Sequence, residues 1–151
     1  MAGHPKYVLD TNCFIDASRS ADVALAFEAF SARAAPRLYL SSVVASELRA
    51  GAVRGSAVLE RRVLAPYVRR GRVLTPSAAA WDALGNTLAA LAQRDGLVLG
   101  QVPRGFALDI LLAYSCRESG AILVSANTRD LERVARVFAF DFVPPYPTHF
   151  D

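Results

Sequence analysis

Three acidic residues stand where the hydrophobic pattern of the sequence predicts burial. Asp10 continues an apolar run, Glu47 interrupts the apolar stripe of a predicted helix, and Asp109 lies in the most apolar helical segment of the chain. A buried carboxylate without a compensating partner is too costly to persist. One divalent cation, held by carboxylates from three separate elements, would compensate all three. Because Mg²⁺ prefers hard oxygen ligands, the pattern predicts a magnesium site for phosphodiester chemistry, with one ion or two.

Each of these acids, taken alone, also has an ordinary structural interpretation. Asp10 is of a residue type favoured at a helix N-cap. Asp109 suits the first turn of a helix, where the helix dipole favours negative charge. Glu47 could pair with Arg49 or Arg54 at the edge of its helix. The hypothesis of a shared cation therefore depends on the joint occurrence of the three acids.

Asn127 and Asp130 are candidates for a further position in the same pocket, because both follow a predicted strand. Their spacing also fits a helix-capping pair, so the sequence leaves their role open. Asp16 lies one helical turn beyond Asn12 and could join an acidic rim, or it could be an ordinary surface acid. A phosphatase-like mechanism with Asp10 as nucleophile is disfavoured, because Asn12 stands where such a site would have a second acid.

Short apolar strands alternate with helical segments, which predicts an α/β sandwich around a mostly parallel sheet. Ligands bind beyond the carboxyl ends of the strands in such folds, where Asp10 and the turn at 125–127 lie. The expected strands are Tyr7–Leu9, Leu38–Leu40, Arg72–Leu74, Ala121–Val124 and Phe140–Val143. The expected helices follow a turn at 10–12 and a loop over 95–105: Cys13 onward, Ala21–Arg33, Ser41 or Ser42 to about Val53, Ala57–Arg70, Pro76–Arg94, Ala107–Ser119 and Asn127–Val137.

The composition indicates a folded, soluble protein. A chain of 151 residues fits one domain, expected over residues 1–151, and 53% hydrophobic with 21% charged residues argues against disorder. Cys13 and Cys116 lie in apolar segments without metal-ligand spacing, which predicts free buried thiols. The sequence shows no signal-peptide core and no apolar run of membrane-spanning length, so we expect a cytoplasmic protein with no membrane partner.

Arginine supplies 16 of the 17 cationic residues, and its planar fork suits bidentate contact with phosphate. This favours a nucleic-acid partner, although a coding bias toward arginine explains the count equally well. The pairs Arg61-Arg62 and Arg69-Arg70 fit a solvated helix face. The arginine content alone therefore assigns no surface to a ligand.

The acidic positions and their surroundings resemble the PIN-domain family. Residues 8–12 resemble its opening hydrophobic-Asp-Thr-Asn motif and residues 46–51 its central Glu-Leu segment. Residues 106–110 resemble its third acidic motif and residues 123–131 its closing Thr-Arg-Asn-x-x-Asp-Phe stretch. Four motifs in order, within a resemblance that covers about residues 7–145, make a specific signal.

The resemblance implies a PIN-like three-layer sandwich, with a short, mostly parallel central sheet flanked by helices. It also implies a metal-dependent endoribonuclease that uses Mg²⁺, with Mn²⁺ as a possible substitute. Thr11 and Asn12 would support the first acid. Asp10 and Asp109 would hold the metal, Glu47 would complete the acidic pocket and help to orient metal-bound water, and the remaining catalytic candidates are Asn127 and Asp130.

Three departures from the family pattern bear on the site. Ser125 and Ala126 replace the usual Thr-Arg, Asn127 stands where many relatives have a fourth acid, and Leu131 replaces the usual Phe. Asn127 adds no charge, so we expect one tightly held ion. The same departures motivate an alternative hypothesis, a catalytically impaired PIN-like module that binds RNA or protein.

A stand-alone domain of this size resembles the VapC toxins of VapBC-type toxin–antitoxin pairs. This narrower resemblance implies transfer or ribosomal RNA as substrate, a cognate VapB-like antitoxin and a homodimer. Several apolar side chains could line an antitoxin groove, although such stripes are also typical of a core. They are Phe14, Val23, Phe27, Phe30, Val58, Leu64 and Tyr67.

Overall fold

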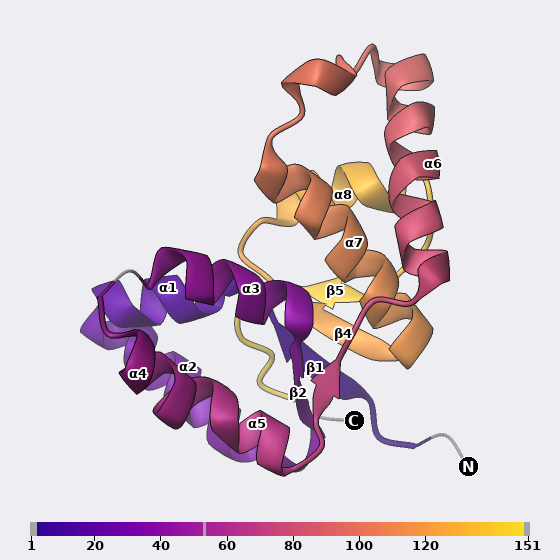
Figure 1. Cartoon of the computed structure of the whole chain (residues 1–151). Coiled ribbons are helices and arrows are strands. Elements are labelled where there is room, and N and C mark those ends of the chain that lie inside the picture. Colours follow the sequence, from indigo (N-terminus) through magenta and orange to yellow (C-terminus); the bar gives the residue numbers. More distant parts are fainter. Residues whose placement is uncertain (1–2, 53, 150–151) are drawn as a thin grey trace.

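Five short strands form one parallel sheet in the computed structural model, which describes residues 3–52 and 54–149. The strand order is β3-β2-β1-β4-β5, and each neighbouring pair is parallel (Figure 1). The predicted parallel sheet is therefore confirmed, with small shifts at the strand ends. The strands are β1 (Lys6–Leu9), β2 (Leu38–Ser41), β3 (Val73–Leu74), β4 (Ala121–Val124) and β5 (Phe142–Val143).

Helices cover both faces of the sheet, which gives the expected three layers. Because side chains alternate along a strand, Tyr7 and Leu9 of β1 pack with α1 and α2, whereas Val8 packs with α3, α7 and α8. The helices are α1 (Thr11–Arg19), α2 (Ala21–Ala34), α3 (Ser42–Gly51), α4 (Ser56–Val58), α5 (Ala65–Arg69), α6 (Ala78–Asp95), α7 (Arg104–Ser119) and α8 (Thr128–Ala135). Short segments of other helical type are η1 (Ala35–Arg37), η2 (Leu59–Leu64) and η3 (Leu99–Gln101).

The pairing of β1 with β4 brings two distant parts of the chain to one edge of the sheet. Leu9 is opposite Val124 in the register, so the residues that follow them, Asp10 and Ser125, leave the sheet side by side. The backbone N–H of Asp10 donates to the carbonyl of Val124 at 2.9 Å, which extends the pairing by one bond. This edge is where the sequence placed the site.

Two predicted helix starts are wrong by a few residues. Thr11 and Asn12 belong to α1 and not to a turn, because Asp10 caps the helix by accepting a hydrogen bond from Thr11 N. Helix α7 begins at Arg104, inside the expected loop, directly after Pro103. A proline suits this place because the first helical turn needs no N–H from it. Asp109 consequently lies in the second turn of α7, and the first-turn interpretation is wrong.

The helix predicted over Ala57–Arg70 is present but contains a π-helical turn. Segments α4, η2 and α5 form one helical stretch, Ser56–Arg69, which we call the α4–α5 arm. Pro66 has no N–H, and its ring would clash with the carbonyl of Arg62 in a regular α-helix. The N–H of Ala65 instead donates to the carbonyl of Glu60, five residues back.

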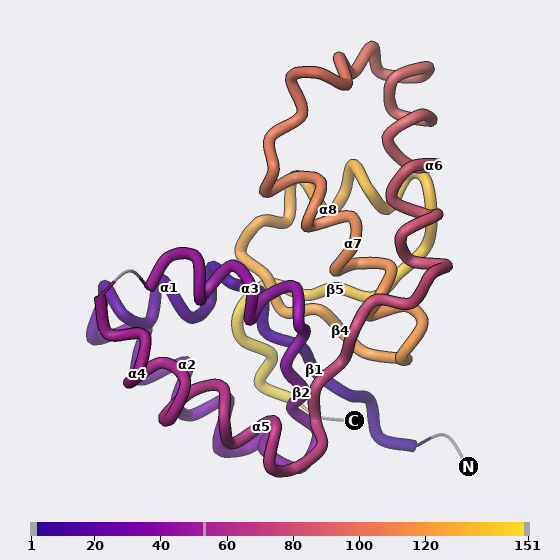
Figure 2. The backbone as a smooth tube through the Cα atoms, viewed as in Figure 1, coloured from indigo at the N-terminus to yellow at the C-terminus, as the bar shows by residue number. Residues whose placement is uncertain are grey.

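The remaining boundaries differ by smaller amounts. Helix α3 ends at Gly51, and the expected final residue Val53 lies outside the described residues. The last strand has two residues and not four. Helices α6 and α7 lie side by side, and the loop between them carries η3 (Figure 2). Within the described part of the chain, no helix is long and apolar enough to cross a membrane.

Two glycine replacements should shift stability in opposite directions. Gly120 ends α7 just before β4 with φ +65°, a left-handed conformation that costs a side-chain-bearing residue about 1–2 kcal/mol. Gly85 lies inside α6 with open space around it, so Ala there should stabilise by about 0.5–1 kcal/mol. Urea unfolding of Gly120→Ala and Gly85→Ala measures both changes. A change of the same sign in the free energy of unfolding of both variants would contradict this account.

Candidate active site

Asp10 is buried at the end of β1, with hydrogen bonds to both of its carboxylate oxygens. Its side chain is 3% exposed. Oδ1 accepts from Thr11 N at 2.7 Å, and Oδ2 accepts from Ser125 Oγ at 2.7 Å and from Asn12 Nδ2 at 3.3 Å. Burial raises the pKa of Asp10, and the three hydrogen bonds oppose that rise. Asp10 is thus both a helix cap and a fixed member of the site.

Ser125 joins the turn after β4 to the start of α1. Its fully buried hydroxyl donates to Asp10 and accepts from Asn12 Nδ2 and from the backbone N–H of Asn127, each at 3.0 Å. Asn12 Oδ1 in turn accepts from Ala126 N at 3.1 Å. The predicted support of Asp10 by Thr11 and Asn12 is therefore confirmed. The role of Ser125 was missed, because only the β1–β4 register reveals that it adjoins Asp10.

Glu47 enters the site from α3 and is held by Thr11. Its Oε1 accepts a hydrogen bond from Thr11 Oγ1 at 2.9 Å. Burial raises the pKa of Glu47 and the nearby Asp10 adds to the rise, whereas the Thr11 bond and the charge of Arg104 lower it. The proposed ion pair with Arg49 is wrong, because Arg49 pairs with Glu60 at 2.5 Å instead. No ion pair between Glu47 and Arg54 occurs among the described residues.

Asp109 meets Asn127 and Asp130 on the other side of the site. Asn127 Nδ2 donates to Asp109 Oδ2 at 2.9 Å and to Asp130 Oδ2 at 3.2 Å. Asn127 stands at the N-cap position of α8, as the capping interpretation predicted, but its side chain makes no capping bond to that helix. Asp109 is 9% exposed, and burial together with Asp10, Glu47 and Asp130 raises its pKa to about 8. The amide of Asn127 links two acids that would otherwise repel each other.

A single cleft of about 370 Å³ unites the predicted positions at the carboxyl ends of β1 and β4. Pro103, Gly105 and Phe106 also line it. The sequence did not predict these three as site residues: it placed Pro103 and Gly105 in a loop, and it included Phe106 only in the third acidic motif. Asp16 is exposed and lines a different cavity. The five predicted residues that line the cleft are Asp10, Glu47, Asp109, Asn127 and Asp130.

The donor set of the cleft fits a hard divalent cation. It offers carboxylate and amide oxygens, the ligand types that Mg²⁺ and Mn²⁺ prefer. In the described residues, no three or more His, Cys, Asp or Glu side chains stand close enough to enclose an ion. Mg²⁺ usually takes only one or two protein carboxylates and keeps several waters, so the two ligands expected from the sequence, Asp10 and Asp109, would be enough to hold it.

A family model for the PIN domain matches residues 7–137 of the chain. The chain belongs to the PIN-domain family. Members of this family are generally nucleases and generally use divalent metals. No curated protein matches this PIN domain at the level of sequence.

Solved structures share the fold of this PIN domain over nearly its whole length. FitAB bound to a DNA fragment aligns with a TM-score of 0.68 and 17% identity, covering 96% of this chain and 99% of that chain. FitAcB from Neisseria gonorrhoeae aligns with a TM-score of 0.67 and 18% identity, covering 92% of this chain and 97% of that chain. DNA-bound VapBC from Salmonella typhimurium aligns with a TM-score of 0.63 and 22% identity, covering 94% of this chain and 99% of that chain.

A second hollow of this PIN domain is an apolar groove between helices α1–α2 and the α4–α5 arm, which we call the helical groove. It comprises two cavities, of about 270 and 680 Å³, that share Phe14, Phe27 and Val63. Of the apolar residues predicted to line a groove, Phe14, Phe27 and Tyr67 do so. The others do not line it: Phe30 and Leu64 belong to the core, Val23 lines another cavity, and Val58 is exposed.

Replacing Asp109 by Asn should stabilise the metal-free protein, and the gain should grow with pH. The pKa of Asp109 is about 8 in the folded protein and 3.8 without its surroundings. Between these values the unfolded chain has released the proton while the folded protein retains it, so the stability of the wild type falls as pH rises. We expect the melting temperature of Asp109→Asn in EDTA to exceed that of the wild type by a few degrees near pH 8 and by little near pH 4.

The exposed Asp82→Asn variant is the matched control and should melt like the wild type at every pH. Saturating Mg²⁺ should remove the advantage of Asp109→Asn, because a cation stabilises the ionised carboxylate that only the wild type has. Identical pH dependence of Asp109→Asn and wild type in EDTA would show that the pKa of Asp109 is not raised.

Proposed function

We propose that the chain is a Mg²⁺-dependent endoribonuclease and the toxin of a VapBC-type toxin–antitoxin pair. The observation that carries the proposal is the gathering of four carboxylates at one cleft, where burial and the other three acids raise the pKa of Asp109. Such an arrangement opposes folding unless a cation compensates it. A PIN domain with this cleft is therefore best explained as a metal-dependent nuclease.

In this proposal, Asp10 and Asp109 hold the metal. A cation held there would supply Lewis-acid chemistry and offset negative charge on the phosphate. Ser125 and Asn12 fix the orientation of the Asp10 carboxylate through their hydrogen bonds. Asn127 holds Asp109 and Asp130 together and adds no charge of its own, which favours one ion over two.

Glu47 is proposed to receive a proton from the attacking water. Its Oε1 is engaged by Thr11, whereas its Oε2 has no hydrogen-bond donor among the described residues. A carboxylate whose pKa is raised by burial is a stronger base than one in water. Thr11 therefore orients Glu47 so that Oε2 accepts the proton.

The proposed substrate is RNA, with transfer or ribosomal RNA as the expected class. The cleft is open to solvent, and the cation that its carboxylates would hold engages the phosphodiester backbone, which all nucleotides share, and not a base. Selectivity would come from RNA shape or from a single-stranded loop that presents its backbone to the acids. We also propose that the chain forms a single domain and acts in the cytoplasm.

The proposed partner is a cognate VapB-like antitoxin, and the proposed assembly is a homodimer. Several structures that share this fold are toxin–antitoxin complexes, among them VapBC from Salmonella typhimurium. The helical groove offers an apolar surface on which a partner segment can bury its own apolar side chains.

Purified protein without antitoxin should cleave RNA in Mg²⁺ or Mn²⁺ and stop in EDTA. Asp10→Asn and Asp109→Asn should abolish detectable cleavage, and Glu47→Gln should slow it by about 10²–10⁴-fold, the range for loss of a general base. Asp82→Asn changes an exposed acid outside the cleft and should cleave at the wild-type rate. Full activity of Asp10→Asn or Asp109→Asn would refute the nuclease proposal.

Asn127 motivates a second candidate, a PIN-like module that binds RNA or protein without cleaving it, because the cleft has an amide where a further acid would stand. Isothermal titration calorimetry separates the two candidates. The nuclease should take up Mg²⁺ in a manner that Asp10→Asn eliminates. A binding module should show no such uptake and no cleavage.

A further inference from the structure

One end of the helical groove is strongly basic. Residues 54–72 contain six arginines and a single acid, Glu60, which is paired with Arg49. Arg62, Arg70 and Arg72 line the smaller cavity of the groove, and no acidic side chain lines it. The end of the groove nearest α3 differs, because Glu28 and Glu47 line it together with two arginines.

The basic end is also lined by apolar side chains and a buried hydroxyl. Phe14, Phe27 and Tyr67 line the same cavity as the arginines. The rings of Phe14 and Phe27 meet edge to face, at 5.3 Å between centroids. Ser31 Oγ lines the cavity as well, and it is buried without a hydrogen-bond partner among the described residues. The pocket therefore combines apolar contacts with an unused polar group.

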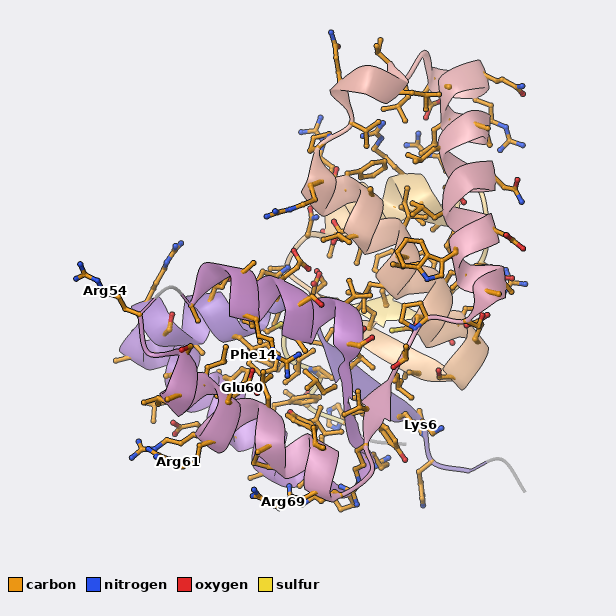
Figure 3. All side chains as sticks on the ribbon, viewed as in Figure 1. Lys6, Phe14, Arg54, Glu60, Arg61 and Arg69 are labelled. Carbon is orange, nitrogen blue, oxygen red and sulfur yellow. The ribbon has the colours of Figure 1, made fainter. Side chains whose placement is uncertain are left out.

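Two of the three arginines are available to a ligand. Arg72 is engaged, because its Nη1 donates to the carbonyl of Ala35 at 2.5 Å. Arg62 and Arg70 are exposed, and neither makes a hydrogen bond or ion pair within residues 3–52 and 54–149. Their neighbours Arg61 and Arg69 lie on the outer side of the arm and point away from Phe14 (Figure 3). The arm thus presents basic residues on two different faces.

These features favour a peptide over RNA at the inner face. An amphipathic helix binds in a groove by laying an apolar stripe against it, with charged residues along the border. Bases would need accessible ring faces for stacking, whereas Phe14 and Phe27 pack against each other. Unpaired guanidinium groups beside an apolar cavity are complementary to a carboxylate that neighbours an apolar side chain.

We propose that the basic end of the helical groove anchors an acidic amphipathic segment of the antitoxin. An apolar side chain of that segment packs against Phe14 and Tyr67, and an adjacent Asp or Glu pairs with Arg62 and Arg70. This assignment rests on the proposed function, which supplies the antitoxin, and it adds the chemistry by which the partner is recognised. Neither arginine lines the acidic cleft, so the anchor is separate from the proposed catalytic residues.

The test uses a fluorescein-labelled amphipathic helical peptide with a leucine stripe flanked by glutamates, and a twin in which every glutamate is glutamine. Fluorescence anisotropy measures binding to the wild type, to Arg62→Glu/Arg70→Glu and to the matched outer-face control Arg61→Glu/Arg69→Glu. We expect the acidic peptide to bind the wild type and the control alike, and the inner-face variant at least about 10-fold more weakly. The glutamine twin should bind weakly to all three.

Arg62→Gln/Arg70→Gln removes the charges without reversing them and should cause a smaller loss in the same direction. Circular dichroism verifies that each variant is folded. Three results would overturn the proposal: no binding of the acidic peptide to the wild type, equal losses in the inner-face and outer-face variants, or weaker binding of a single-stranded RNA to the inner-face variant with unchanged peptide affinity.

The RNA cleavage assay on the same variants separates this proposal from the proposed function. Arg62→Glu/Arg70→Glu should cleave RNA at the wild-type rate, because the acidic cleft is untouched. A wild type that discriminates between the two peptides but cleaves no RNA would support the peptide anchor and count against the nuclease.

Discussion

The parallel pairing of β1 with β4 is the constraint on which the acidic cleft depends. It ends both strands at the same level, so Asp10 and Ser125 meet and a hydroxyl reaches a buried carboxylate. Helix α7 runs back against β4 through the short connection at Gly120 and carries Asp109 to the same edge. Strand register therefore brings these residues together, and the hydrogen bonds of Asp10 then hold its side chain in place.

The crowding of acids in the cleft lowers the stability of the folded protein. Burial and the neighbouring acids raise the pKa of Asp109, which opposes folding with this carboxylate ionised, and the apolar core on both faces of the sheet offsets that opposition. A cation that binds only the folded protein adds stability in proportion to the logarithm of its concentration over its dissociation constant. If the proposed cation binds this PIN domain, metal occupancy and folding would thus be two linked equilibria, as expected where active-site groups reduce stability.

The sequence predicted the elements and the five cleft residues better than the contacts between them. Short apolar runs between helical segments locate the strands, and acids at positions where burial is expected locate a polar cleft. Both signals follow from local burial. The Ser125–Asp10 bond depends on strand register, and the Arg49–Glu60 pair depends on how the α4–α5 arm packs against α3. Such long-range arrangements leave no periodic signal. The catalytic and metal-binding roles of the cleft residues stay predictions.

The Arg49–Glu60 pair joins the α4–α5 arm to α3 beside the helical groove. Both side chains are about half exposed, at 51% and 48%, so the ion pair contributes little to stability, and salt weakens it further. Residues 54–58 are exposed, whereas Leu64 is fully buried in the core. The arm is therefore attached to the domain mainly by the burial of Leu64, whereas its exposed beginning is joined to α3 by this weak ion pair. The wider cavity of the helical groove, which Arg54 and Leu59 line, is bordered by that weakly held end.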